Sequence, residues 1–182
     1  MTNSGNIYKI EEYSRKAWST KYFFISEGTK KIIIVVQYAF IGLKAERLVY
    51  NLGFGTYDQS REDVYDDDVS GNDDHYKVLN TVLSTVPDFL HNYPGVMVMV
   101  KGSDSAPEFR EKCRLKCKKR CIPPACKNIH RRISIYINYV NKHFGQLSGE
   151  YKFWGGKNID RQLYMEEYWP YNQYDSVFFV KK

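Results

Sequence analysis

The sequence predicts an α+β domain in which helices pack on a mostly antiparallel sheet. Three observations support this prediction: a β-branched run at residues 32–36, a helical repeat of apolar residues between 78 and 90, and turn residues between short strands. The predicted order is strands, then helices with one strand among them, then strands again, which is typical of this fold class. With 182 residues, of which 43% are hydrophobic, the chain is the size of one domain, 1–182.

The first strands are expected to form an antiparallel meander. Residues 22–26 alternate as a strand does, residues 27–30 form its turn, and residues 32–36 are apolar enough for a buried strand. Residues 48–57 return as a third strand, in which Gly53 and Gly55 indicate a bulge or a close approach of the backbone. Residues 1–20 are polar, and we expect a loose arm there.

The clearest helix is predicted over residues 73–92. Asn72 is its expected N-cap, Asp73 and Asp74 favour its first turn, and Pro87 predicts a kink. A buried strand is expected at residues 96–100. The apolar face of the helix consists of Val78, Leu79, Val82, Leu83, Val86, Phe89 and Leu90.

The second half is expected to begin with two more helices. Ser105 and Glu108 have the spacing of a capping box, and that helix is predicted to end near Cys121, before Pro123-Pro124. A third helix is expected from about residue 125 to Gly145. We group residues 107–145 as a basic, Cys-rich helical hairpin and residues 150–182 as closing strands, at 151–154, 163–168 and 177–180.

Five short motifs are shared with a known family. They are Tyr22-x-Phe24-x-Ser26-Glu27-Gly28, Tyr50-Asn51-Leu52-Gly53-Phe54-Gly55-x-Tyr57-Asp58, Lys77-Val78-Leu79-x-Thr81-Val82, Tyr93-Pro94 and Gly102-Ser103-Asp104-Ser105. Together they resemble a small bacterial family that is known only as a domain of unknown function. The resemblance covers roughly residues 20–110 and implies a compact cytosolic protein, without supplying an activity. The family has an Arg-rich helix after the Gly-Ser motif, where this chain is rich in Cys and Lys.

The net charge of +6 is unevenly distributed. Residues 58–74 contain eight acids and one base, whereas residues 108–132 contain ten bases and two acids. Such a basic segment predicts either a binding surface for an anionic partner or an ordinary solvated surface. The candidate nucleic-acid-binding or anion-binding residues are Lys101, Ser103, Arg110, Arg114, Lys118, Lys119, Arg120, Arg131 and Arg132. Aromatic residues that would stack on bases are Tyr136, Tyr139, Phe144 and Trp154, although the first and third lie on an apolar stripe.

The four cysteines lie close together in this basic segment. Cys113, Cys117, Cys121 and Cys126 are candidate zinc ligands, with His130 as a further ligand after a turn. Their spacing is not that of a C-x2-C zinc knuckle. Packed free thiols on a helix face and a disulfide therefore remain as alternatives.

Two other segments were weighed as ion sites. Asp66, Asp68 and Ser70 begin like a calcium loop, but Lys77 stands where the bidentate acid is required, so we expect no high-affinity calcium site. The turn at residues 101–105 follows a strand and opens a helix, which suits either an anion site or ordinary helix capping.

No catalytic constellation is visible, since the four histidines are scattered and no phosphate loop is present. The sequence therefore favours a non-enzymatic cytoplasmic binding domain that contacts nucleic acid or an acidic protein. The alternative is a small phosphate-handling hydrolase or transferase that uses the Gly102–Arg110 junction. We expect neither a signal peptide nor a membrane span, because the longest apolar run, 32–40, is too short for one.

Overall fold

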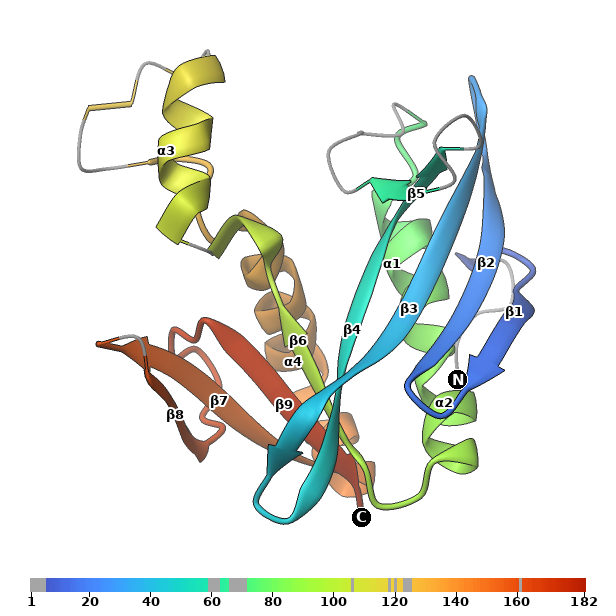
Figure 1. Ribbon diagram of the computed structural model, residues 1–182, viewed down its shortest axis with the longest axis vertical. Helices are drawn as coiled ribbons and strands as arrows, with labels where there is room; N and C mark the ends of the chain where they lie inside the picture. The colour runs from blue at the N-terminus through green and yellow to red at the C-terminus, as the bar shows by residue number, and fades with distance from the viewer. Residues whose placement is uncertain are drawn as a thin grey trace. The chain divides into compact units, whose positions relative to one another are not determined.

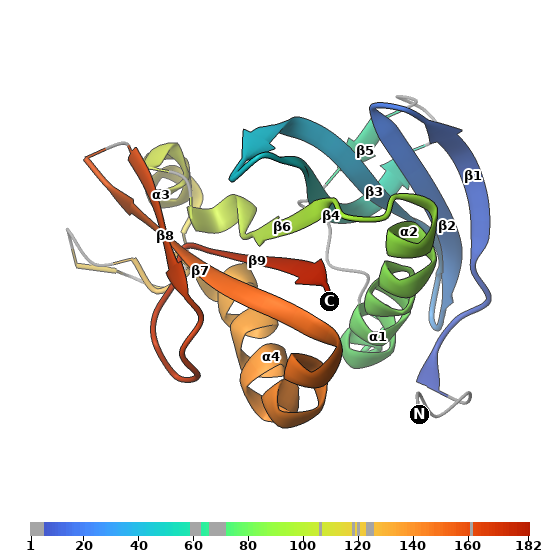
Figure 2. The same ribbon diagram turned by 90° about the horizontal axis from the view of Figure 1, so that it is seen from below.

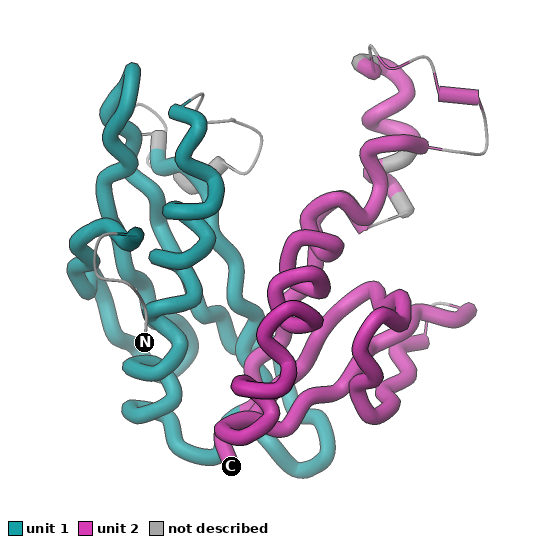
Figure 3. The backbone as a smooth tube through the Cα atoms, turned by 180° about the vertical axis from the view of Figure 1, so that it is seen from behind, with its two compact units in different colours: residues 1–96 teal, residues 97–182 magenta. Residues whose placement is uncertain are grey.

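The computed structural model describes residues 6–58, 63–65, 72–105, 107–117, 119, 121–122, 126–160 and 162–182. The chain divides into two compact units, Met1–Val96 and Met97–Lys182 (Figure 3). Each unit has its own antiparallel strands and its own helices. Whether the two units form the single domain predicted from the sequence stays a prediction.

The first unit contains an antiparallel meander (Figure 1). Its strands are β1 (Glu11–Lys16), β2 (Ser19–Glu27), β3 (Lys31–Lys44), β4 (Arg47–Asp58) and the short β5 (Asp63–Tyr65). Each strand from β2 to β5 pairs with the strand before it. In β2 nearly every second residue is buried, because alternate side chains point to opposite faces of a sheet. The predicted meander is therefore confirmed, and β1 lies where a loose arm was expected.

Two short helices cover one face of this sheet (Figure 2). They are α1 (His75–Ser84) and α2 (Val86–Asn92), and they meet at Thr85. The break agrees with the kink expected from Pro87, which lies in the first turn of α2, where its missing N–H is tolerated. The core between helices and sheet is aromatic: the rings of Tyr38 and Phe89 stack with centroids 3.8 Å apart, and Tyr50 meets Phe89 edge-on.

Asn72 has a different role from the one predicted. The residue before the first turn of α1 is Asp74, so the predicted N-cap at Asn72 is wrong. The Asn72 amide instead bridges the β2–β3 turn: it accepts a hydrogen bond from Lys30 N at 3.2 Å and donates to Lys30 O and to Ser26 Oγ, each at 2.9 Å. A Cβ at Gly28 would come within 2.6 Å of this amide, which explains the glycine in the turn.

The second unit is an antiparallel sheet with helix α4 on one face (Figure 2). Its strands are β6 (Met97–Lys101), β7 (Tyr151–Ile159), β8 (Gln162–Glu167) and β9 (Ser176–Lys181), in the spatial order β6-β9-β7-β8. Strands β6 and β9 are buried along nearly their whole length, as their uniformly apolar sequences predicted. The α+β prediction with a mostly antiparallel sheet is thus confirmed.

The two helices of this unit differ from the predicted bounds. Helix α3 (Pro107–Lys116) ends before Cys121, because the basic run that follows offers no apolar face to bury. Helix α4 (Arg131–Glu150) continues through Gly145, which was expected to end it. Its buried stripe, Ile133, Ile137 and Val140, anchors the helix on the sheet, and this packing outweighs the roughly 1 kcal/mol that a mid-helix glycine costs.

Within the described residues, no helix has the length and apolar character needed to cross a membrane.

Candidate functional site

The basic segment, residues 107–145, presents many of its charges to solvent. Lys112, Arg114, Lys119, Lys127 and Arg131 are exposed, and so is Lys101 before the segment. Among the described residues, the ion pairs do not include any of these six bases. Of the other predicted contact residues, Lys118 and Arg120 lie outside the described residues, and the side chain of Arg110 is not described.

Most of the α3 side chains that the structure describes are exposed to solvent. Leu115 is 86% exposed, and its neighbours Glu111, Lys112 and Arg114 are exposed too. The aromatic residues expected to stack on bases are less available, since Tyr136, Tyr139, Phe144 and Trp154 are all half-buried. The Phe144 ring packs against those of Phe153 and Tyr168 and belongs to the core of the second unit.

The turn predicted as an anion site contains a buried carboxylate of the chain itself. Residues Ser103–Ser105 form a 3₁₀ turn, and Asp104 at its centre is only 3% exposed. Its Oδ2 accepts a hydrogen bond from the backbone N–H of Arg132 at 2.9 Å, in the first turn of α4. A carboxylate at a helix N-terminus satisfies the free N–H groups and the positive end of the dipole, as a bound anion would.

Two of the predicted anion-binding residues contact each other beside this turn. The Arg132 guanidinium donates a hydrogen bond to Ser103 Oγ. A Cβ on Gly102 would come within 2.4 Å of Asp104 Oδ1 and 2.9 Å of Ile133 N, so the backbone here is closely packed. The geometry therefore favours capping of α4 over a phosphate site at this junction.

His130 lies immediately before α4, with a left-handed backbone (φ 61°). Its Nδ1 is 3.1 Å from Ser105 Oγ and 3.8 Å from Asp175 Oδ1. Sequence reasoning missed this group, because Asp175 is far away in the chain. Serine and carboxylate face the same ring nitrogen, whereas a proton relay needs them on opposite nitrogens. The contacts of His130 with Ser105 and Asp175 therefore stabilise the start of α4, and the three residues are not arranged as a catalytic triad.

Hydrogen-bond contacts bring three of the four cysteines, Cys113, Cys117 and Cys121, close together at the end of α3. All four are free and half-buried. The sulfurs of Cys117 and Cys121 are 3.9 Å apart, and the side-chain amide of Asn128 contacts the sulfurs of both Cys113 and Cys117. The prediction that three of them share a helix face is wrong, because α3 ends at Lys116. The approach of Cys126 to the others stays a prediction.

Nitrogen donors surround these sulfurs. The side-chain amide of Asn128 donates to the sulfurs of Cys113 at 3.2 Å and of Cys117 at 3.6 Å. Backbone N–H groups donate as well, from Lys119 to the sulfur of Cys117 at 3.4 Å and from Lys127 to that of Cys121 at 3.3 Å.

These contacts shift the pKa values of the thiols in different directions. The N–H of Lys119 is the main cause that lowers the pKa of Cys117, and the N–H of Asn128 does the same for Cys126. The Asn128 amide also lowers the pKa of Cys113, but burial and the neighbouring thiols of Cys126 and Cys117 outweigh it, so the net shift is upward. In the described part of the chain, no three cysteine, histidine or acidic side chains surround one point as metal ligands do.

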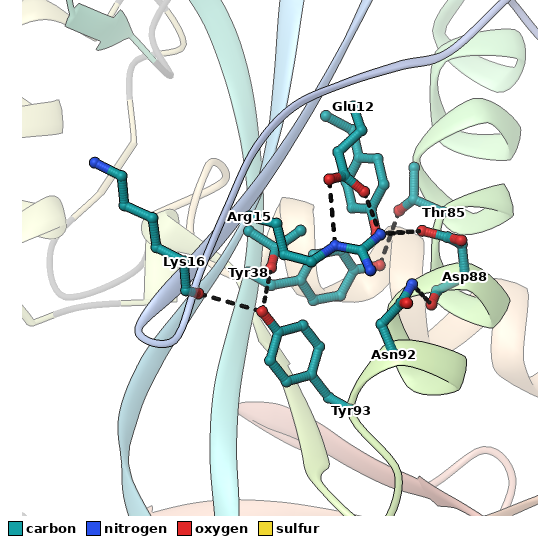
Figure 4. Close-up of polar contacts among 10 residues, drawn as sticks. Glu12, Arg15, Lys16, Tyr38, Thr85, Asp88, Asn92 and Tyr93 are labelled. Carbon is teal, nitrogen blue, oxygen red and sulfur yellow. Dashed lines mark hydrogen bonds and ion pairs between the residues drawn. The ribbon is translucent and has the colours of Figure 1, made fainter.

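A second polar cluster lies in the first unit, between β1 and α2 (Figure 4). The Arg15 guanidinium pairs with Glu12 and lies 3.8 Å from Asp88, whose carboxylate accepts a hydrogen bond from the Tyr22 hydroxyl at 2.7 Å. Burial, and then the bond to Asp88, raise the pKa of Tyr22. A cavity of about 300 Å³ lies here, lined by Ile10, Glu12, Tyr22, Ser84, Thr85 and Asp88.

This cluster has a structural explanation. Tyr93 donates a hydrogen bond to Lys16 O at 3.2 Å and accepts one from Thr20 Oγ at 3.1 Å, so α2 and the residue after it hold β1 in place (Figure 4). Arg15 already balances the two carboxylates that line the cavity. We therefore assign the cluster to the attachment of β1, a strand that the sequence analysis did not predict.

The predicted absence of a calcium site is not tested, because Asp66, Asp68 and Ser70 lie outside the described residues. Asp74, at the end of the acidic stretch, accepts hydrogen bonds from Tyr8 at 2.7 Å and Ser26 at 2.6 Å.

The chain belongs to a family described as "Family of unknown function (DUF6934)", whose model matches residues 6–114. The resemblance seen in the sequence is thereby confirmed at the level of the family. No curated protein and no solved structure matches the chain. The matched residues end within α3, so Cys117, Cys121 and Cys126 lie beyond them.

Proposed function

We propose that this chain is a non-enzymatic cytoplasmic binding protein whose basic segment, residues 107–145, acts as a helical hairpin that contacts nucleic acid. The observation that carries the proposal is the exposure of Lys112, Arg114, Lys119, Lys127 and Arg131, none of which forms an ion pair within the described residues. A basic side chain that is already paired with an acidic side chain would have to give up that ion pair in order to bind a phosphate. A basic side chain without such a pair gains binding free energy directly, because it releases the counterions of the polyanion.

The lack of packing around α3 also supports a binding role. A helix that leaves Leu115 86% exposed contributes little to the core, so its exposed surface is available to a partner. The free thiols are in keeping with a reducing compartment, where disulfides are rare. We do not propose the phosphate-handling alternative as a second function, because the Asp104 carboxylate occupies the N-terminus of α4 beside the Gly102–Arg110 junction.

The test measures binding of labelled single- and double-stranded DNA and RNA by fluorescence anisotropy over a range of salt concentrations. We expect weak affinity that depends little on sequence, with dissociation constants of about 10⁻⁴ to 10⁻⁶ M near physiological salt. The double variant Arg114→Glu/Lys119→Glu should bind more weakly and flatten the log–log salt slope by about 2, roughly one per lost phosphate contact.

The matched control is Lys44→Glu/Lys181→Glu, which changes the net charge equally at two exposed lysines outside the segment. If both double variants lose the same affinity, net charge alone explains the binding and the segment is not the contact surface. If the wild-type protein binds no nucleic acid well above about 100 μM, nucleic acid is not the partner. Salt-sensitive binding of an acidic peptide in its place would assign the segment to an acidic protein.

A further inference from the structure

We propose that Cys117 and Cys121 form a reversible oxidation site, at which hydrogen peroxide converts the two thiols into a disulfide. This reaction depends only on the two sulfurs and the groups around them. It is therefore independent of whether the basic segment binds nucleic acid.

The distance between the two sulfurs is the first argument. They lie 3.9 Å apart, which is close to van der Waals contact. A disulfide bond shortens this separation to about 2.05 Å. Both residues lie outside helices and strands, and each sulfur turns about a single side-chain torsion with three staggered positions. The bond can therefore form largely by rotation of the two side chains.

The donors to the sulfur of Cys117 are the second argument. The backbone N–H of Lys119 donates to this sulfur at 3.4 Å, and the side-chain amide of Asn128 donates at 3.6 Å. The Lys119 N–H is the main cause that lowers the pKa of Cys117, and the positive charge of Lys119 acts in the same direction. At Cys113 the net shift of the pKa is upward. Since peroxide reacts with the thiolate, Cys117 is the sulfur that reacts first.

Access to solvent is the third argument. Cys117 and Cys121 are half-buried, and the neighbouring side chains of Lys119 and Ile122 are exposed. A small oxidant and a thiol reductant can both reach sulfurs in such a position. An accessible thiol of lowered pKa beside a second thiol is the arrangement of redox-sensing cysteines. In a reducing compartment, a disulfide of this kind is transient.

The oxidation proceeds in two steps. In the first, the Cys117 thiolate attacks one oxygen of hydrogen peroxide, an S–O bond forms, the O–O bond breaks and hydroxide leaves, which gives a sulfenic acid. In the second, the Cys121 thiolate attacks the Cys117 sulfur, the S–S bond forms and hydroxide leaves. The two thiol protons convert both hydroxides to water. The sulfurs are oxidised and the peroxide is reduced, and glutathione reverses the reaction by thiol–disulfide exchange.

The test treats the reduced full chain with hydrogen peroxide, blocks the remaining thiols with N-ethylmaleimide and measures the intact mass. The reduced protein should carry one blocking group on each of its four free cysteines, and the oxidised protein should carry two fewer. Fragmentation of peptides prepared without reductant should show Cys117 joined to Cys121. Glutathione added before the blocking step should restore the mass of the reduced protein.

Single variants separate the two steps. Cys121→Ser should react with peroxide at the wild-type rate but stop at the sulfenic acid of Cys117, which dimedone labels. Cys117→Ser should lose both the sulfenic acid and the disulfide. Cys126→Ser, at another half-buried cysteine of the segment, is the control and should still form the disulfide. The rate of the first step should rise with pH and level off above the pKa of Cys117, because only the thiolate reacts.

Four outcomes would overturn the proposal. The first is a wild-type protein that keeps all its thiols after peroxide treatment. The second is a disulfide that joins another pair, such as Cys113 and Cys117. The third is a Cys121→Ser variant in which another cysteine becomes the sulfenic acid. The fourth is a disulfide between two chains, seen as a dimer on a non-reducing gel. A nucleic-acid-binding result of either sign leaves all of these readings unchanged.

Discussion

The helix pair of the first unit and the basic segment of the second unit are built in different ways. Phe89, on α2, is fully buried and stacks on Tyr38, whose hydroxyl donates to Thr85 Oγ at 2.8 Å while Thr85 donates to the carbonyl of Val82. Leu115, on α3, is 86% exposed. Beyond α3, the N–H groups of Lys119 and Lys127 donate to cysteine sulfurs, and the N–H of Arg132 in α4 donates to Asp104.

The difference shows which physical term shapes each region. Around α2, burial of apolar surface supplies the stabilisation, and the polar groups are satisfied inside the packing. None of the α3 side chains that the structure describes is buried, so local polar contacts and charge dominate there. Changes to side chains should therefore alter the stability of the first region and the ligand binding of the second.

The largest expected effect comes from the packed region. Phe89→Ala removes a fully buried ring that contacts Tyr38, Tyr50 and Tyr93, and we expect a loss of about 3–5 kcal/mol in the free energy of unfolding. Leu115→Ala should change it by less than about 0.5 kcal/mol. Urea unfolding followed by circular dichroism measures both. Equal losses in the two variants would mean that α3 is packed like α2.

An intermediate effect is expected at the turn before α3. Asp104→Ala removes the acceptor for the Arg132 N–H at the start of α4, and loss of such a cap costs about 1–2 kcal/mol. Asp104→Asn keeps an oxygen acceptor and should cost less. Thermal unfolding of both variants beside the wild type tests this order. If Asp104→Ala were as stable as the wild type, the carboxylate would not be needed as a cap.

The smallest effect is a gain. A Cβ at Gly145 would meet no heavy atom within 4 Å, and the residue lies inside α4, so Gly145→Ala should stabilise the protein by up to about 1 kcal/mol. The shift in the denaturation midpoint reports it. Gly155→Ala is the contrasting variant and should destabilise, because its Cβ would come within 1.9 Å of the Tyr174 ring.

Sequence reasoning succeeded where one face of an element is apolar. The sequence predicted strands β2, β3, β4, β6 and β9 and the α1–α2 pair. In these elements the spacing of apolar residues along the chain indicates which side is buried. Strand β1 was missed, since the run EEYSRK has no buried side to reveal it. Its place depends on pairing with β2 and on the contacts of Arg15 and Lys16 with α2 and the residue after it.

The candidate sites followed the same division. The cysteine spacing and the charge of the basic segment are properties of neighbouring residues, so the sequence displays both. The Asp104–Arg132 cap and the approach of Asp175 to His130 join residues far apart in the chain, and no local pattern signals them. Gly102 gave a weak hint, because a glycine after a buried strand often marks a close backbone approach.

The sequence by itself determined the fold class, the positions of the apolar elements, the family and the clustering of charge and thiols, because each depends on composition or on spacing along the chain. Tertiary structure decided that β1 is a strand, that α4 continues through Gly145, and that Asp104 fills the N-terminus of α4. The physical reason is that these features depend on contacts between distant residues, whose free energies exceed the local preferences that a sequence pattern records.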